Sequence, residues 1–176
     1  MVSAGLLILR LVAGLTIASH GAQKLLGWFD GPGMGGVRGM MAQMGVKPAP
    51  LWAYAVALTE LFGGLLVALG LLTPIAALLV FADLLIATTV HISKGFFNQK
   101  GGYEYPLVFA TVFFALAAIG PGIYSLDVAL GIDLVSMPVF VGTLMVVLAG
   151  CVAAMTSRHI VPSAAGRQSQ APAAGR

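Results

Sequence analysis

Ionisable side chains that could do chemistry lie inside the long apolar stretches of this chain. Arg10, Glu60 and Asp83 each fall near the middle of such a stretch. An arginine at membrane depth costs at least about 2.5 kcal/mol, so groups of this kind normally face other protein or a polar cavity. Arg10 also lies on a helical stripe with Gly14 and Lys24, which would turn a basic face toward the other helices.

These three groups are predicted to share one depth, because each lies roughly halfway along its stretch. An arginine fork suits a bidentate carboxylate, and burial makes each partner need the other. We therefore expect a structural ion pair between Arg10 and Glu60. One arginine cannot neutralise two carboxylates, so we expect the second acid, Asp83, to hold a proton. A protonatable acid at mid-membrane could relay protons or bind a polar head group.

A second polar group is predicted where three apolar stretches meet the membrane surface. Its members are His20, Lys24, His91, Tyr103, Glu104 and Tyr105. Such residues could simply satisfy one another's hydrogen bonds. Two histidines on different helices would also suit bis-histidine haem ligation, which we favour less than a quinone pocket. Histidine, tyrosine and lysine near an acid supply the hydrogen-bond donors and the proton source that a quinone head group requires. The sequence has no metal-ligand cluster, phosphate-binding loop or catalytic triad.

Composition indicates a membrane protein. Of the 176 residues, 59% are hydrophobic and 9% are charged, whereas soluble domains have about 25% charged residues. The net charge is +3, but the basic residues form no cluster that would make a surface patch, which argues against nucleic-acid binding. Cys151 is the only cysteine, so the chain can form neither an internal disulfide nor a C-x-x-C redox pair. The expected surroundings are therefore a lipid bilayer.

Five membrane-spanning helices are expected, each bounded by glycine, proline or polar loops. They cover about residues 3–26, 49–71, 74–96, 105–119 and 137–155. A short amphipathic helix over about 34–45 should lie on the membrane surface. Its methionines, with Val37, recur at helical spacing, and we favour packing over copper(I) binding for them. Residues 1–156 would form the bundle, and 157–176 a disordered cytoplasmic tail.

Lysine and arginine placement predicts the orientation. Apart from Arg10, the basic residues fall at the end of the first span, in the loops after the first and third spans, and in the tail. Cytoplasmic loops carry an excess of these residues. The N-terminus should therefore lie outside and the C-terminus in the cytoplasm.

Four segments carry a family resemblance. They are RLVAGLTIASHGAQKL at 10–25, TELFGGLLVALGLLTP at 59–74, GGYEYP at 101–106 and GPGIYSLD at 120–127. In this order they resemble the DoxX family of small bacterial integral membrane proteins. The resemblance implies a four-helix bundle in the bacterial cytoplasmic membrane, associated with oxidoreductase systems such as quinone-linked thiosulfate oxidation or oxidative-stress complexes. The family's polar positions fall on Arg10, His20, Gly21, Lys24, Glu60, Glu104 and Asp127. Asp83 and the fifth span depart from the family pattern.

Together these observations predict an all-α membrane bundle with four polar-cored helices and a fifth apolar span. The first functional hypothesis is a membrane subunit of an oxidoreductase, which would interact with quinone and carries no recognisable redox centre of its own. The second is a non-catalytic scaffold that docks partner proteins. A small proton or solute transporter is least favoured, because five spans without an inverted repeat do not match common transporter plans. Other protein subunits or a homo-oligomer are the expected partners.

Overall fold

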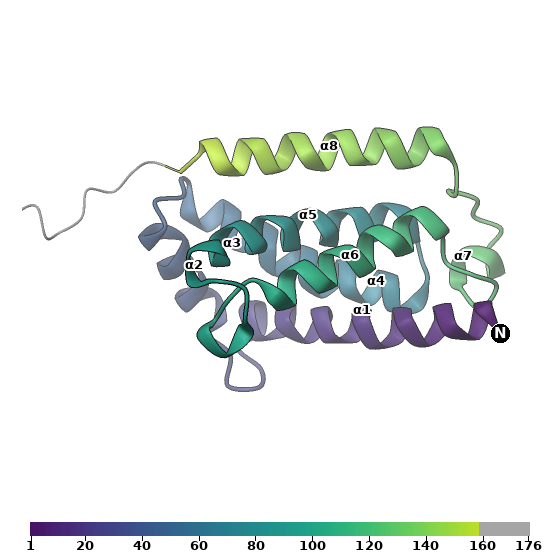
Figure 1. The fold of residues 1–176 in the computed structure, drawn as a ribbon, viewed down its shortest axis with the longest axis horizontal. Helices are drawn as coiled ribbons and strands as arrows, with labels where there is room; N and C mark the ends of the chain where they lie inside the picture. The colour runs from purple at the N-terminus through teal and green to yellow at the C-terminus, as the bar shows by residue number, and fades with distance from the viewer. Residues whose placement is uncertain (159–176) are drawn as a thin grey trace, which may run out of the picture.

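Antiparallel helices of membrane length build the fold, which the computed structural model describes for residues 1–158. The long helices fall into two sets that run in opposite directions (Figure 1). The first set is α1 (Val2–Leu26), α5 (Thr73–His91) and α8 (Met137–Thr156); the second is the helix from Ala49 to Leu69 and α6 (Glu104–Ile119). No strand occurs within the described residues. The predicted all-α membrane bundle is confirmed, and the predicted tail, residues 157–176, lies outside the described residues from position 159 onward.

Within residues 1–158, four helices are long and apolar enough to cross a bilayer, namely Val2–Leu26, Ala49–Leu69, Thr73–Lys94 and Met137–Thr156. α6 is also apolar but has 16 residues, a rise of about 24 Å against a hydrocarbon core of about 30 Å. It packs along α5 and begins after a loop that contains the short helices η2 (Ile92–Lys94) and η3 (Asn98–Lys100). The chain is a multi-pass membrane protein.

The second span is one continuous helix with a π-helical turn at its centre. α3 (Ala49–Leu58) passes into the π turn η1 (Thr59–Gly63), and the helix continues as α4 (Gly64–Leu69). Single π turns inside α-helices are frequent at functional sites. This one carries Glu60, which is buried.

Glycines allow α1 to approach the second span closely. A Cβ atom on Gly14 would come within 2.6 Å of the Gly64 carbonyl oxygen, and one on Gly21 would overlap the backbone of Leu61. Small residues at such crossings are the usual way in which membrane helices bring their backbones together. The crossing fixes the register of the two antiparallel helices. The N-terminal end of α1 therefore lies beside the C-terminal end of the second span.

Two apolar clusters hold the bundle together. The main one joins α1, α4, α5, α6 and α8, and includes the fully buried Leu78, Phe113 and Leu116. The smaller one packs α2 (Gly33–Gln43) against α3 through Val37 and Met41. Met34 and Met44 pack at its edge. α8 lies along α5 at the outside of the bundle (Figure 1).

Candidate functional site

Arg10 lies near the end of the bundle that carries the N-terminus. Its side chain is 0% exposed, and Nη2 donates a hydrogen bond to the carbonyl oxygen of Tyr124. The guanidinium occupies the space that a Cβ atom on Gly70 would need. The acidic group whose charge acts on it is Asp127. Arg10 therefore joins α1 to the turn after α4 and to the loop after α6.

Asp127, in the short helix α7 (Leu126–Ala129), completes this end of the bundle. Its carboxylate accepts hydrogen bonds from the N–H groups of Leu72 at 2.7 Å and Thr73 at 2.9 Å. Its own N–H donates to the Gly70 carbonyl oxygen at 2.8 Å. The first N–H groups of a helix lack partners within it, and a carboxylate there is stabilising. Asp127 thus caps α5, and together with Arg10 it forms a structural clamp.

Glu60 pairs with Lys24 rather than with Arg10. The Lys24 ammonium group forms a hydrogen-bonded salt bridge with Oε1 of Glu60, and the two side chains are 24% and 6% exposed. The predicted Arg10–Glu60 ion pair is wrong for a geometric reason. Fourteen residues of helix separate Arg10 from Lys24, or about 21 Å, and the close crossing of α1 with the second span sets only Lys24 beside the π turn.

Asp83, half-buried on α5, joins this pair. Its side chain lines a cavity together with that of Lys24, and it lies near enough to Glu60 and Lys24 for their charges to act on its carboxyl group. We call these three residues the acid–lysine cluster. The structure therefore brings the two predicted mid-membrane acids together, but around Lys24 in place of Arg10.

A cavity of about 650 Å³ lies beside the cluster, between α1, α5, the loop after α5 and the start of α6. We call it the histidine cavity, because His20 and His91 both line it, together with Glu60 and Tyr105. Its walls include apolar side chains such as that of Phe109. This volume is within the usual range of about 300–1,000 Å³ for small-molecule sites, and such sites combine apolar walls with a few polar groups in this way.

The orientation of His91 is set by one hydrogen bond. Nδ1 lies 2.8 Å from the carbonyl oxygen of Gly101. A carbonyl oxygen can only accept, so Nδ1 carries a hydrogen, and in the neutral ring Nε2 is left as an acceptor. Gly101 itself lines the histidine cavity, so this bond ties the ring to the cavity wall.

Three residues of the predicted surface group do not line the histidine cavity, and one of them, Lys24, pairs with Glu60. The Tyr103 ring packs edge-on against Phe96, with ring centroids 5.4 Å apart. The Glu104 carboxylate accepts a hydrogen bond from the N–H of Asn98 at 3.1 Å, in an exposed position. The predicted convergence of Tyr103 and Glu104 with the histidines is therefore wrong, whereas Tyr105, a member of the same predicted group, does line the cavity from the first turn of α6.

A second cavity, of about 260 Å³, lies on the other side of the acid–lysine cluster. We call it the methionine cavity, because Met40, Met41 and Met44 line it. Lys24, Asp83, His91 and Arg158 also line it. Asp83 further borders a lipid-facing crevice of about 270 Å³ between α3, α5 and α8, which also contains Cys151.

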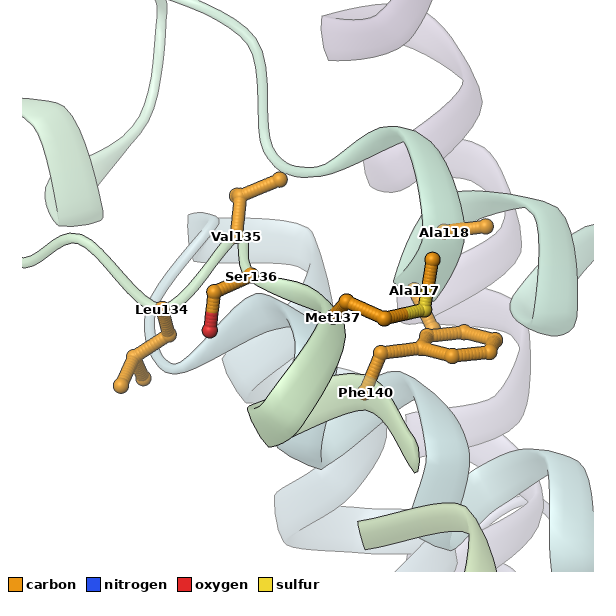
Figure 2. Close-up of a pocket in the computed structure, with 7 residues that line it drawn as sticks. All are labelled: Ala117, Ala118, Leu134, Val135, Ser136, Met137 and Phe140. Carbon is orange, nitrogen blue, oxygen red and sulfur yellow. The ribbon is translucent and has the colours of Figure 1, made fainter. Parts of the chain in front are cut away.

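The opposite end of the bundle has a crevice of a different character. Its volume is about 200 Å³, and it lies between the last turn of α6 and the start of α8. Figure 2 shows Met137 and Phe140 reaching from α8 toward Ala117 and Ala118, with Ser136 as the one hydroxyl-bearing residue of the set. Nothing in this lining can exchange protons near neutral pH, so the candidate chemistry lies in the histidine cavity.

Comparison with known proteins places this arrangement in a family. The DoxX family matches residues 5–92, half of the chain. The chain belongs to the DoxX family. It is similar to Putative oxidoreductase CatD of Bacillus subtilis (strain 168), with 32% identity over 113 residues, which cover 64% of this chain and 78% of that protein. No solved structure matches the chain.

The region matched to DoxX contains the whole acid–lysine cluster. It also contains both histidines of the histidine cavity, since His91 is near its end. The wall formed by Tyr105 and Phe109, and the whole of α8, lie beyond the match. The polar centre of the site thus belongs to the DoxX part of this chain.

Proposed function

We propose that this DoxX protein is a membrane subunit of a quinone-linked oxidoreductase system, and that a quinone head group binds in the histidine cavity. The observation that carries this proposal is the meeting of His20, His91 and the buried Glu60 in one cavity with apolar walls. The similarity to Putative oxidoreductase CatD of Bacillus subtilis supports the oxidoreductase part of the proposal.

The lining suits both redox forms of such a ligand. Quinone carbonyl oxygens accept hydrogen bonds, which the Tyr105 hydroxyl and an N–H of His20 can donate. Quinol hydroxyl groups donate, and Nε2 of His91 and the Glu60 carboxylate can accept. Apolar side chains such as Phe109 would cover the ring and the start of its hydrocarbon tail.

The proposed location is the bacterial cytoplasmic membrane, with the N-terminus outside and the C-terminus in the cytoplasm. Its support is the distribution of lysine and arginine, since those of the described residues other than Arg10 lie toward the end of the bundle that holds α2 (Figure 1). The histidine cavity is then nearer the cytoplasmic face. Other protein subunits, or further copies of this chain, would complete the proposed system.

Binding of a short-chain quinone tests the proposal. The full chain in lipid nanodiscs is titrated with decylubiquinone, and wild type is compared with His20→Ala, His91→Ala and the double variant. We expect the double variant to weaken binding at least tenfold with an unchanged circular-dichroism spectrum. Tyr103→Phe is the matched control, because Tyr103 packs on Phe96 and does not line the cavity.

The same variants in cells separate the proposal from a scaffold. A quinone-binding subunit should lose quinone-linked activity at normal protein level when both histidines are replaced. Full activity in the double variant would contradict the proposed site. Activity lost only when partner proteins no longer co-purify would favour a scaffold that docks them.

A further inference from the structure

The carboxylate of Glu60 has one oxygen in use and one free. Oε1 pairs with Lys24, whereas Oε2 is buried and has no hydrogen-bond partner among the described residues. Glu60 is 5% exposed and lines the histidine cavity. Leaving a buried charged oxygen without a donor is costly. This oxygen therefore needs a donor, which is either a proton or a group on a ligand in the cavity.

Asp83 faces the other side of the cluster. It lines the methionine cavity and the crevice beside α8, while Glu60 lines the histidine cavity. Lys24 pairs with Glu60 and borders the methionine cavity together with Asp83. The acid–lysine cluster is thus part of the wall that separates the two cavities.

The charges of the three side chains indicate that the acid–lysine cluster binds one additional proton. Two carboxylates and one ammonium group carry a net charge of −1 when all are ionised, and one added proton makes the cluster neutral. Burial within a bilayer disfavours the uncompensated charge. The other titratable or charged groups that border the same cavities and crevice are His20 on α1, His91 on α5, Cys151 on α8, Tyr105 on α6 and Arg158 after α8.

We propose that Glu60 and Asp83 share one exchangeable proton and pass it between the histidine cavity and the methionine cavity. When a hydroxyl group in the histidine cavity gives its proton to Oε2 of Glu60, the cluster releases one proton from Asp83 into the methionine cavity. The reverse sequence delivers a proton to the ligand, and Lys24 stays protonated throughout. The inference rests on the proposed function only for the identity of that ligand. The π turn at Glu60, a backbone feature common at functional sites, falls on this cluster.

Infrared spectroscopy of the full chain in lipid nanodiscs tests the shared proton without any ligand. A protonated carboxyl group gives a C=O stretching band well separated from carboxylate bands, and the band shifts in D2O if its proton exchanges. We expect wild type at neutral pH to show one such band and to shift it in D2O. A band that stays unshifted would mean that the proton does not exchange with solvent, and this would overturn the proposed proton transfer.

Substitutions in the acid–lysine cluster test whether these side chains hold the proton. Asp83→Asn and Glu60→Gln each leave one carboxylate for one lysine, so each should abolish the band. Lys24→Met leaves two carboxylates without a cation, so the band area should about double. Asp133→Asn is the matched control, because Asp133 is exposed and lies outside both cavities. A band that survives in both acid variants would assign the proton elsewhere and reject the inference.

Measuring decylubiquinone binding alongside the infrared band distinguishes this inference from the proposed function. If the band changes in the variants as expected but the protein binds no quinone, the shared proton is supported and the proposed quinone site is rejected. If the quinone binds and depends on the histidines, but wild type has no exchangeable band, the site stands and the shared proton fails. Should Lys24→Met fold poorly, Lys24→Gln gives the same charge count with a polar side chain.

Discussion

The ammonium group of Lys24 and the carboxylate of Glu60 form an ion pair inside the bundle, at the π turn of the second span. Each partner comes from a different helix, and neither is well exposed to water. Removing one partner from a buried pair strands the other charge, which is strongly destabilising. The pair is therefore expected to hold the C-terminal half of α1 against the second span.

Lys24→Met should cost more stability than Glu60→Gln. The lysine variant leaves two acids without a cation, and we expect a loss of about 3 kcal/mol. The glutamine variant leaves Asp83 to face Lys24, and we expect about 1 kcal/mol. Thermal unfolding in detergent measures both, with Lys100→Met as the control at an exposed lysine. Equal losses would show that Asp83 cannot replace Glu60 as the partner of Lys24.

The clamp at the other end of the bundle should behave as a separate unit. Arg10→Met and Asp127→Asn each remove part of one network, so the double variant should lose less stability than the sum of the single losses. Arg10→Met combined with Glu60→Gln should instead be additive, because Arg10 lies about 21 Å along α1 from Lys24, the partner of Glu60. Denaturant unfolding of wild type, the three single variants and the two double variants checks this, and an additive Arg10–Asp127 pair would refute the clamp.

Close packing of α1 depends on Gly14. A methyl group at this position would meet the backbone of Gly64 and Ala68, whereas one at Gly5 meets nothing within 4 Å. Gly14→Ala should therefore lower the unfolding temperature by several degrees, and Gly5→Ala should leave it unchanged or slightly higher, since alanine favours helix. If both variants unfold at the wild-type temperature, the close crossing of the two helices does not contribute to stability.

The helical membrane class was predictable because composition and apolar length decide it. Asp83 could be expected near Glu60, since a short turn before Pro74 makes their helices antiparallel neighbours. The partner of Arg10 could not be derived, because a position halfway along a span does not reveal the register between two helices. That register comes from the Gly14–Gly64 crossing, a contact between residues far apart in the sequence.

Two local features were also beyond sequence reasoning. The segment Thr59–Gly63 has no residue that marks a π turn, so its extra backbone residue appears only in the structure. Tyr103 and Tyr105 are two residues apart, and which of them lines the cavity depends on where α6 begins.

Orientation in the membrane remains a prediction from the basic residues. Reporter fusions after residues 47, 100 and 158 should report the cytoplasm, because lysine or arginine lies in or beside each of these segments. A fusion after Asp127 should report the outside. A cytoplasmic result at Asp127 would mean that α6 does not cross the membrane, and this is the informative case because α6 is shorter than the other spans.

Comparing the Tyr105→Phe variant with the Tyr103→Phe variant tests how the histidine cavity recognises its ligand. Tyr105 lines the cavity, and its hydroxyl can donate to a carbonyl oxygen, whereas Tyr103 packs on Phe96 outside it. Removing one neutral hydrogen bond costs about 0.5–1.5 kcal/mol, so Tyr105→Phe should weaken decylubiquinone binding about two- to tenfold. The matched change at Tyr103 should leave binding unaltered. Because both variants keep the aromatic ring, a loss confined to Tyr105 reports the hydroxyl itself. An equal loss in both would mean that the loop before α6 affects the site only through its fold.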